Sequence, residues 1–376
     1  MPLKLVLNGR FLVRPVTGVE RLAIELTRAI RAVVATRGLG DDVDIVVPSA
    51  TGDQHEKVAS FGPPVPSIMP VGRLDGHAWE QIELPKVAPK AWLLNFCNIA
   101  PMTRMRQAVV ICDAQFVLHP ESYSWAFRTW YRVVLTVVAR RAAAVFTISE
   151  FSKGQLERFG IVPKGKAHVL KLGVDHLNDL VADDSVLERC GLRSRPYVLA
   201  IGSLARHKNL PTLIDAFIAA NLPGVDLVVA GGSNERVFHD AGLREADNVR
   251  YIGRVSDGEL KALYGNALAF ACPSLSEGFG FTPLEAMTTG CPVIATTGGA
   301  VPEVCGDAAI YADPHNQAAW EDALRRIVTD AGLRADLAER AGRRAQQFVW
   351  RDTAVQMLTV LATQDGDQAA LTALTP

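Results

Sequence analysis

The stretch that decides the fold is Ser276-Glu277-Gly278-Phe279-Gly280-Phe281-Thr282-Pro283-Leu284-Glu285-Ala286-Met287. It passes from a β-rich run into a helical pattern through a glycine-bearing loop. Thr282 is a favourable N-cap residue and Pro283 a favourable first helical residue, so backbone N–H groups near Gly280–Leu284 should point outward at a helix N-terminus. A phosphate would bind well there, because it would meet several N–H donors and the positive end of the helix dipole.

Two glutamates lie eight residues apart in this stretch, one in the loop and one in the first helical turn. Glu285 could be the capping-box partner of Thr282 and nothing more. Glu277 stands at the carboxyl end of a strand, where α/β sheets bind ligands, and a carboxylate there can accept hydrogen bonds from sugar hydroxyls. A solvated loop glutamate is the alternative interpretation of Glu277.

The alternation of strand and helix continues along the whole chain and predicts parallel sheets with crossover helices. We expect an α/β protein with a first domain at 1–175, a polar linker at 176–195 and a second domain at 196–351. Expected strands lie at 3–8, 43–47, 91–96, 108–112, 143–148, 197–201, 226–230, 267–272 and 292–296. Expected helices include 124–141, 283–289, 318–348 and 352–363, before a tail at 364–376 with little to bury.

Length and composition describe an ordinary globular protein of two domains. The chain has 376 residues, 49% of them hydrophobic, and its 39 Lys and Arg against 40 Asp and Glu give 39 − 40 = −1. This balance argues against a nucleic-acid partner held by a global positive field. The six cysteines form no C-x-x-C pair and fit buried thiols in a reducing compartment. We find no signal-peptide pattern or spanning segment, and expect a cytoplasmic protein or one bound to a membrane face.

A second group of candidates follows the strand at 197–201, in Gly202-Ser203-Leu204-Ala205-Arg206-His207-Lys208-Asn209. A lysine at this strand end could neutralise charge on a departing diphosphate, which is work that a metal ion does elsewhere. Two surface cations at a helix entrance are the simpler alternative.

The first domain offers weaker candidates. Gly18 lies at a helix entrance, where Thr17 and Glu20 fit a capping box, and its amide could face a ligand. Asp113 and His119 follow the strand at 108–112, where catalytic groups gather, although an ordinary hydrogen-bonded Asp and His would explain them equally.

Several other motifs do not carry a function. Asp42-Val43-Asp44 has the Asp-x-Asp form of metal-dependent sugar transferases but precedes its strand. Gly278-Phe279-Gly280 begins like a dinucleotide fingerprint, but Pro283 takes the place of the third glycine. The histidines and cysteines show no zinc-site spacing. We therefore predict no metal and no cofactor.

Taken together, these residues resemble the retaining glycosyltransferases of family 4, with the GT-B architecture of two Rossmann-like domains facing across a cleft. This resemblance implies that the first domain lies on the acceptor side and that the second binds the nucleotide sugar. Glu277 through Glu285 resembles the E-x7-E motif of that family, Lys208-Asn209 its donor-loop pair, and 286–294 the segment that follows. The N-terminal half is similar, less specifically, to mannosyltransferase-like enzymes of bacterial surface-polysaccharide assembly. That likeness lies in 8–12, 17–19, 95–101, 119–121 and 149–152.

The resemblance implies a role for each candidate. Glu285 would hold the nucleotide ribose and Glu277 the hydroxyls of the transferred sugar. Lys208 and Arg206 would bind the diphosphate, and Gly18 the phosphates from the facing domain. The donor-binding set is completed by Gly202, Ser203, Gly278, Phe279, Gly280, Phe281, Thr282 and Leu284. The resemblance also implies that the last helix, within 352–376, crosses back to the first domain, with Trp350 and Arg351 marking the crossing.

One departure from the family pattern bears on activity. Where much of the family has His-Asp after this strand, the chain has Cys112-Asp113. A thiol cannot replace an imidazole as a charged donor, so either Asp113 and His119 cover that role or activity is weakened. The segment at 205–208 also lacks the Glu-Pro-Arg-Lys form of related enzymes, and of its residues Lys208 is the one carried over.

We therefore expect a metal-independent retaining glycosyltransferase. It would move a hexose from a nucleoside diphosphate sugar, GDP-mannose first and a UDP-hexose second, to a glycan or lipid-linked glycan acceptor. Alternatives are a nucleotide-sugar-binding protein that has lost transfer, a GT-B sugar-nucleotide epimerase and, less favoured, a nicotinamide dehydrogenase. A helix carrying Arg128, Arg132, Arg140 and Arg141 could touch anionic lipid as a peripheral contact, or could be an ordinary solvated face.

Overall fold

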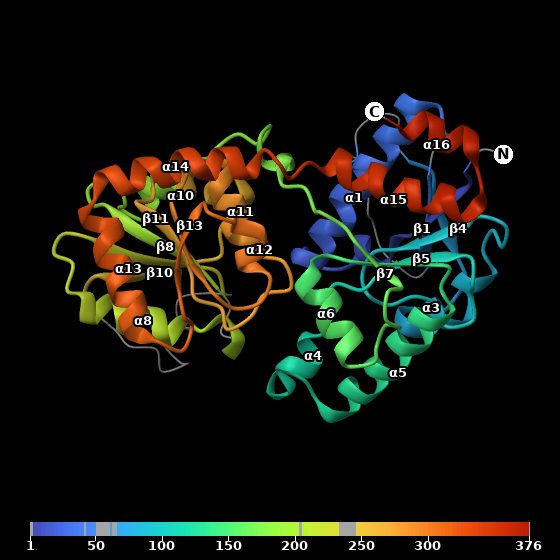
Figure 1. Ribbon diagram of the computed structural model, residues 1–376, viewed down its shortest axis with the longest axis horizontal. Helices are drawn as coiled ribbons and strands as arrows, with labels where there is room; N and C mark the ends of the chain where they lie inside the picture. Colours follow the sequence, from blue (N-terminus) through green and yellow to red (C-terminus); the bar gives the residue numbers. More distant parts are fainter. Residues whose placement is uncertain are drawn as a thin grey trace. The chain divides into compact units, whose positions relative to one another are not determined.

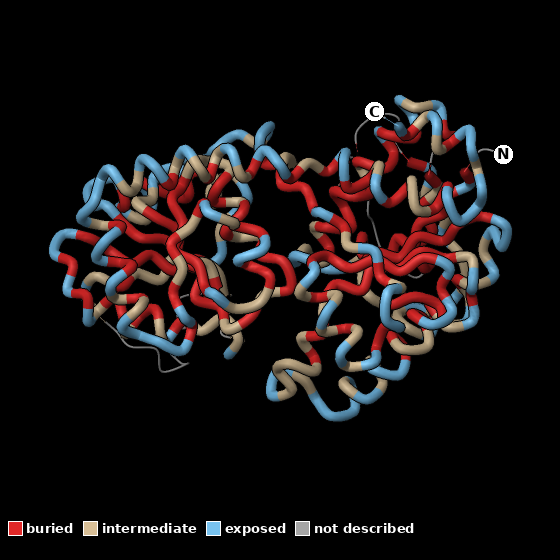
Figure 2. The backbone as a smooth tube through the Cα atoms, in the orientation of Figure 1, coloured by how far each residue is buried: buried red, intermediate tan, exposed pale blue. Residues whose placement is uncertain are grey.

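The computed structural model of the protein describes residues 3–40, 43–49, 61, 66–202, 205–232 and 246–375. The chain forms two compact units, one of Met1–Gly173 with Val349–Pro376 and one of Val174–Phe348. Each unit is a parallel sheet with helices on its faces (Figure 1). Most of the strands are buried and the outer helix faces are exposed (Figure 2). Within the described ranges, no helix is both long and apolar enough to cross a membrane.

The first unit is built on a parallel sheet in the order β3-β2-β1-β4-β5-β6-β7. Its strands are β1 (Leu5–Asn8), β2 (Asp44–Pro48), β3 (Ile68–Val71), β4 (Trp92–Asn95), β5 (Gln107–Val110), β6 (Ala144–Thr147) and β7 (Ala167–Val169). The five strands expected here are present, whereas the sequence did not predict β3 and β7. Both lie at a sheet edge and are partly exposed, so neither shows a continuous apolar run. Chain order reverses between β1 and β4, which makes this the switch point of the sheet.

Helices cover both faces of this sheet. They are η1 (Gly9–Val13), α1 (Gly18–Arg37), α3 (Gly76–Ile82), η2 (Leu84–Lys86), α4 (Gln115–Leu118), η3 (Pro120–Ser122), α5 (Trp125–Arg141), α6 (Glu150–Arg158), α15 (Trp350–Asp365) and α16 (Gln368–Leu374). The predicted capping box at the start of α1 is present, with the Thr17 N–H donating to the Glu20 carboxylate at 3.3 Å.

The C-terminal helix α15 returns to the first unit, as predicted. It packs against α1, and its Asp365 carboxylate accepts hydrogen bonds from the Trp92 indole at 2.9 Å and from the Arg106 guanidinium at 2.6 and 2.7 Å. The return needs Gly173, because a Cβ there would lie 2.2 Å from the Trp350 backbone nitrogen. The expectation that 364–376 has little to bury was wrong, since α16 buries Ala370 and Leu374.

The second unit has a parallel sheet in the order β10-β9-β8-β11-β12-β13. Its strands are β8 (Tyr197–Ile201), β9 (Asp226–Ala230), β10 (Val249–Gly253), β11 (Ala269–Cys272), β12 (Val293–Thr296) and β13 (Ala309–Ala312). Its helices are η4 (Asp175–Leu177), α7 (Ser185–Arg189), η5 (Arg206–Lys208), α8 (Leu210–Ala220), α10 (Asp257–Asn266), α11 (Phe281–Thr288), α12 (Val301–Cys305), α13 (Gln317–Thr329) and α14 (Ala331–Ala345). The switch point of this sheet lies between β8 and β11.

The segment 176–195, predicted to be a linker, contains the short helix α7, which buries Val186 and Leu187, and the Lys261 ammonium donates to the carbonyls of Leu177 and Leu180. One expectation for this unit was wrong. The helical pattern at 318–348 divides at Asp330, which is extended and accepts a hydrogen bond from the Leu333 N–H at 2.9 Å. One side chain thus caps α14 where α13 ends.

Candidate functional site

The switch point of the second sheet brings the two predicted motifs together. Strand β8 leads into the turn η5, which holds Lys208, and β11 leads into the loop that holds Glu277. Because β8 and β11 are parallel neighbours, both loops leave the same edge of the sheet. This edge is where open α/β sheets bind ligands.

Lys208 and Glu277 form an ion pair at this edge. The Lys208 Nζ lies 2.7 Å from Glu277 Oε1, and the Ser274 hydroxyl donates to the same oxygen at 2.6 Å. The Lys208 side chain is 27% exposed and that of Glu277 is 17% exposed, so the pair is largely buried but open at one side. Burial opposes ionisation of Glu277, but the ammonium and the two hydrogen bonds outweigh it and hold the pKa below its ordinary value. Glu277 is therefore a carboxylate, able to accept further hydrogen bonds.

Asn209 fixes the turn that presents Lys208. Its backbone is left-handed, with φ of 53°, and its amide donates to the carbonyls of Pro273 at 3.1 Å and Pro314 at 2.8 Å. The Leu275 N–H donates to the His207 carbonyl at 2.7 Å. The bonds to Pro273 and His207 join the lysine turn to the strand end and loop that lead to Glu277, and so help to fix the distance between the two charged residues.

The glutamate loop is held from its other side by glycines. Gly299 has φ of +70°, and a Cβ there would lie 2.4 Å from the backbone nitrogen and oxygen of Glu277. A Cβ at Gly298 would lie 2.2 Å from the Leu275 carbonyl oxygen. The Ala300 N–H donates to the Glu277 carbonyl at 2.9 Å. The loop therefore lies directly on the backbone that follows β12, which restricts its movement.

The helix after the glutamate loop begins earlier than predicted. Its N-cap is Gly280, with φ of 110°, and α11 begins at Phe281, so Thr282 is not the N-cap and Pro283 is not the first helical residue. Gly280 can take this left-handed conformation because it has no Cβ. The backbone N–H groups of the first helical positions are therefore those around Phe281 and Thr282, both half-buried. The anion site proposed for this terminus remains a prediction.

Two other members of the predicted donor set are core residues. Phe279 is 4% exposed and packs edge-on against Phe281 and Phe348, and Leu284 is fully buried. Their side chains support the loop from beneath. Any donor contact they make would come from backbone atoms.

Glu285 is not a capping-box residue, since Thr282 does not cap the helix. It lies half-buried near Tyr264, whose hydroxyl donates a hydrogen bond to the Thr282 carbonyl at 3.3 Å. Burial, and then the Glu285 charge, raises the pKa of Tyr264 well above its ordinary value. Tyr264 is therefore a neutral phenol that packs beside the start of α11.

The remaining predicted residues of this unit differ in exposure. Gly202 is buried, and a Cβ there would meet the Leu210 side chain at 2.9 Å, so packing alone explains this glycine. Ser203 lies outside the described residues. Gly278 is buried in the loop, and Arg206 is exposed at the start of η5.

The predicted residues of the first unit lie near the carboxyl edge of its own sheet. Gly18 is exposed, and a Cβ there would meet nothing within 4 Å. The Asp113 carboxylate accepts a hydrogen bond from the Gln115 N–H at 3.0 Å, and His119 Nδ1 lies 3.4 Å from Glu121 Oε1. Cys112 is 3% exposed, and burial followed by the Asp113 charge raises its pKa well above the ordinary thiol value. It is a neutral thiol.

Ser274, Tyr264 and the pair Gly298-Gly299 were missed by sequence reasoning. Ser274 had a weak signal, since it follows the β11 strand three residues before Glu277. Tyr264 comes from another helix, and nothing in its spacing points to Glu285. Within the described chain, no three His, Cys, Asp or Glu side chains gather closely enough to hold a metal ion.

The fold defines the structural class to which the protein belongs. Two Rossmann-like parallel-sheet units with a C-terminal helix that returns to the first unit are the GT-B architecture, which confirms the predicted fold. The Anabaena protein HepE, solved in complex with UDP and glucose, has this fold. It matches with a TM-score of 0.73 and 18% identity over 96% of this chain and 100% of its own.

A family model matches the sequence of the second unit. Residues 191–344 match the model for glycosyl transferases group 1. The second unit is therefore similar to a glycosyl transferase group 1 domain, in line with the predicted resemblance.

Several relatives are named as mannosyltransferases. O-antigen chain mannosyltransferase B of Escherichia coli is 31% identical over 58% of this chain and 60% of its own length, so the match spans less than two thirds of that protein. The GDP-mannose-dependent alpha-(1-6)-phosphatidylinositol monomannoside mannosyltransferase of Mycobacterium tuberculosis is 28% identical over 73% of this chain and 76% of its own.

Proposed function

We propose that the protein is a retaining, metal-independent glycosyltransferase that moves mannose from GDP-mannose to a glycan acceptor in polysaccharide synthesis. The observation that carries the proposal is the Lys208–Glu277 pair at the switch point, beside the start of α11. The names of the two mannosyltransferase relatives support mannose, and one of them supports GDP-mannose. A UDP-hexose is the second choice of donor.

Each proposed role follows from the chemistry of its residue. The Lys208 ammonium and the N–H groups at the start of α11 stabilise the negative charge that develops on the departing diphosphate. These groups do the electrostatic work for which other transferases use a metal ion. Arg206, exposed on the same turn, adds positive charge. Glu277 accepts hydrogen bonds from hydroxyls of the transferred sugar, and Glu285 from the ribose.

The acceptor hydroxyl attacks from the face that the diphosphate leaves, with a phosphate oxygen as the base and no covalent intermediate. The bond from the sugar to the phosphate oxygen breaks as the bond to the acceptor oxygen forms, so the configuration is retained. Positioning by Glu277 and Lys208 supplies the proximity this step needs. Asp113 and His119 are proposed to help the first unit orient the reacting groups.

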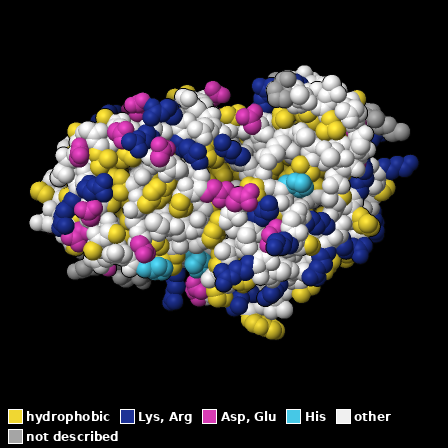
Figure 3. Space-filling view, viewed as in Figure 1, with side chains coloured by type: hydrophobic (Ala, Val, Ile, Leu, Met, Phe, Trp, Pro, Cys, Tyr) yellow, Lys and Arg dark blue, Asp and Glu magenta, His cyan; other side chains and the backbone are white. Residues whose placement is uncertain are grey.

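We further propose that the acceptor glycan is lipid-linked and that the protein makes a peripheral contact with the membrane. On the face shown in Figure 3, Lys and Arg side chains gather over the region of α5 and α6. Arg132, Arg140 and Arg141 are exposed on α5. Each basic residue near an anionic bilayer surface adds roughly 1 kcal/mol of attraction. Salt-sensitive co-sedimentation with vesicles of anionic phospholipid supports the contact, and salt-insensitive or absent binding contradicts it.

A second candidate function is a nucleotide-sugar-binding protein with weakened or lost transfer. The buried, neutral thiol of Cys112 favours it, because a neutral thiol cannot supply the charged donor of the usual histidine. A Cys112→His variant tests this directly. Transfer that rises in the variant supports weakened activity in the native chain.

The deciding experiment combines donor binding with turnover in the full chain. Thermal unfolding with GDP, UDP, ADP and their sugars identifies the nucleotide, since a ligand at 100 times its Kd stabilises the native state by about 2.7 kcal/mol. Transfer is then measured with the best donor, with and without a chelator, and the product anomer is determined. Transfer with retained configuration that survives chelation supports the proposal. Donor binding without hydrolysis or transfer contradicts it, and donor isomerisation without acceptor indicates an epimerase.

A further inference from the structure

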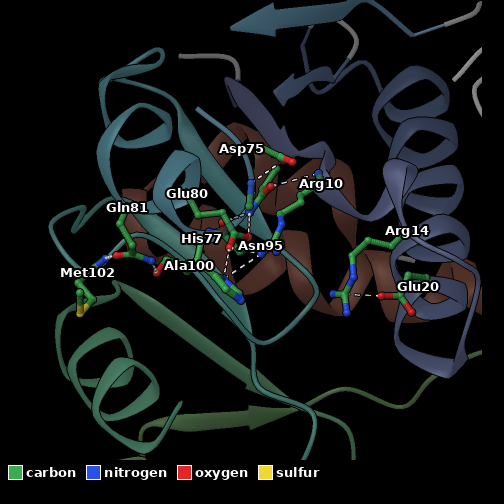
Figure 4. Close-up of polar contacts among 12 residues, drawn as sticks. Arg10, Arg14, Glu20, Asp75, His77, Glu80, Gln81, Asn95, Ala100 and Met102 are labelled. Carbon is green, nitrogen blue, oxygen red and sulfur yellow. Dashed lines mark hydrogen bonds and ion pairs between the residues drawn. The ribbon is translucent and has the colours of Figure 1, made fainter. Parts of the chain in front are cut away.

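The first unit holds a pocket of about 170 Å³ at the switch point of its own sheet, with walls from the loops after β1 and β4, the start of α1, and α3 and α5. Its two glutamates are already paired (Figure 4). Glu80 Oε2 lies 2.5 Å from Arg10 Nη1 and 2.9 Å from His77 Nδ1. Glu20 Oε1 lies 3.2 Å from Arg14 Nη1, apart from the first group. The ionic groups of the pocket therefore hold one another in place.

The Tyr131 side chain, on the α5 wall of the pocket, is arranged differently. In the described part of the chain, no residue forms a hydrogen bond with its hydroxyl. Its ring stacks on Phe127 with the centroids 4.9 Å apart and meets Phe116 edge-on at 5.0 Å. Contacts on two sides of a ring restrict its rotation, so the hydroxyl is presented in one direction.

The Tyr131 hydroxyl lies near the end of β5. Burial, and then the charge of Asp113, raises the pKa of Tyr131 well above its ordinary value, with Cys112 the next group to act on it. Such electrostatic effects weaken with distance, so these two residues and the hydroxyl share one region of the first unit. Tyr131 is therefore a neutral phenol beside the position where the family resemblance leads us to expect a histidine.

Of the three side chains in this region, Tyr131 is the best hydrogen-bond donor. Cys112 is buried and neutral, and a thiol S–H is a weak donor. The carboxylate of an aspartate such as Asp113 accepts hydrogen bonds and donates none. A phenol O–H donates well and does not have to be charged to do so.

We propose that Tyr131 is a catalytic residue whose hydroxyl donates a hydrogen bond to one hydroxyl of the transferred sugar, in place of the histidine that Cys112 replaces. This role rests on the proposed glycosyltransferase function, and it explains how a chain with a thiol at this position transfers sugar. A sugar hydroxyl both accepts and donates, so it can accept from Tyr131 and donate to Asp113.

The test removes the hydroxyl and keeps the ring. Tyr131→Phe retains the packing against Phe127 and Phe116. Tyr123→Phe is the matched control, because Tyr123 also feels the Asp113 charge and stacks on Phe127 at 5.6 Å but does not line the pocket. Thermal unfolding checks that both variants fold.

Transfer by the full-length chain is measured with GDP-mannose and with its monodeoxy analogues, each of which lacks one sugar hydroxyl; UDP-glucose and its analogues replace them if the thermal panel selects UDP. For the complete donor, kcat/KM should fall about threefold to tenfold in Tyr131→Phe and keep its native value in Tyr123→Phe. For the one analogue that lacks the contacted hydroxyl, the native chain and Tyr131→Phe should react equally. A loss of the same size for every donor indicates a structural role and overturns the proposal.

A rescue experiment tests the replacement itself. Transfer by the double variant Cys112→His, Tyr131→Phe should exceed that of Tyr131→Phe, whereas Cys112→His alone should change transfer little. A large gain in Cys112→His alone overturns the proposal, because Tyr131 would then leave the role unfilled. Native transfer that Tyr131→Phe does not reduce overturns this role alone. A native chain that neither hydrolyses nor transfers donor contradicts the proposed function, and this role with it.

Discussion

The carboxyl edges of the two sheets carry different charge arrangements at the same topological position. At the edge of the second sheet, Lys208 and Glu277 lie beside a helix start and an exposed arginine, so positive groups are in excess. At the edge of the first, Arg10 and Arg14 are each matched by a buried glutamate. An edge with excess positive charge suits a diphosphate, and a balanced edge suits neutral hydroxyls. The fold therefore sets where ligands bind, and local charge balance decides which ligand.

The largest expected effect is the loss of turnover in Lys208→Met. Without the ammonium, the departing diphosphate loses a charge-stabilising donor, and kcat should fall by about 10² to 10³-fold. Steady-state kinetics with saturating donor measures this. Lys261→Met is the control, because the Lys261 ammonium donates to backbone carbonyls and serves stability. The Lys261→Met molecules that remain folded should have the kcat of the native chain.

The Lys208→Met variant also leaves the Glu277 carboxylate without its cation. The free energy of unfolding should drop by about 2 kcal/mol, the typical effect of removing a hydrogen-bonded charged partner. The double variant Lys208→Met, Glu277→Gln should regain most of that stability and remain inactive. Recovery of activity in the double variant would show that the lysine serves only to neutralise the glutamate.

Most of the fold could be predicted because alternating strands and helices occur in both halves of the chain. The strands that were missed are short or lie at sheet edges, as Ile68–Val71 and Ala167–Val169 do, and carry little apolar pattern. The start of α11 was misplaced because Thr282-Pro283 is a good local start signal. The left-handed Gly280 begins the helix earlier, and its packing near Val301 is a tertiary contact that no local pattern reports.

The two sites differ in how much the sequence could reveal. Lys208 and Glu277 each stand in a recognisable motif, so the family resemblance placed both at one donor site, although it did not predict their ion pair. Arg10 and Glu80 are 70 residues apart, and their contact depends on how α3 packs beside β1. One signal was available: Asn8 and Asn95 are polar residues in buried strands. Buried amides need partners, and the Asn8 amide donates both to the Asn95 side chain and to the Glu80 carboxylate.

A glycine from each unit sharpens the comparison further. Gly18 in the first unit is exposed with open space around it, so Gly18→Ala should change the free energy of unfolding by less than about 0.5 kcal/mol. If a phosphate approaches its backbone, transfer should fall by roughly tenfold or more, because small displacements of bound groups are costly. Gly154→Ala, in α6 and equally open, is the control that keeps native transfer.

Gly299→Ala should give the opposite result. Its left-handed backbone and the close approach of Glu277 leave no room for a Cβ. The free energy of unfolding should therefore fall by about 1–3 kcal/mol. Chemical denaturation and transfer assays on both variants make the test. Equal stability loss in Gly18→Ala and Gly299→Ala would contradict a ligand-facing role for Gly18.

The smallest expected effect compares one carboxylate from each unit under acid. The pKa of Glu277 is lowered because Lys208 and its hydrogen bonds outweigh burial, and that of Asp365 is lowered because Arg106 and Trp92 outweigh burial. A lowered folded-state pKa stabilises the protein above the ordinary pKa, and this stability is lost as pH falls through the folded-state value. For both groups the window therefore lies below the ordinary values of 4.5 and 3.8.

Denaturant unfolding between pH 7 and pH 3 measures these contributions. Glu277→Gln and Asp365→Asn should each lower stability at pH 7 by up to about 1 kcal/mol and converge with the native chain as the pH falls. The Glu277 contribution should disappear at higher pH than that of Asp365 if the two shifts are similar, because the ordinary glutamate value is higher. Nucleotide binding should reduce the difference in unfolding free energy between Glu277→Gln and the native chain. It should leave the corresponding difference for Asp365→Asn unchanged, since Asp365 ties α15 to the first sheet. An acid response of Asp365→Asn that depends on nucleotide would show that the two units do not hold their ligands independently.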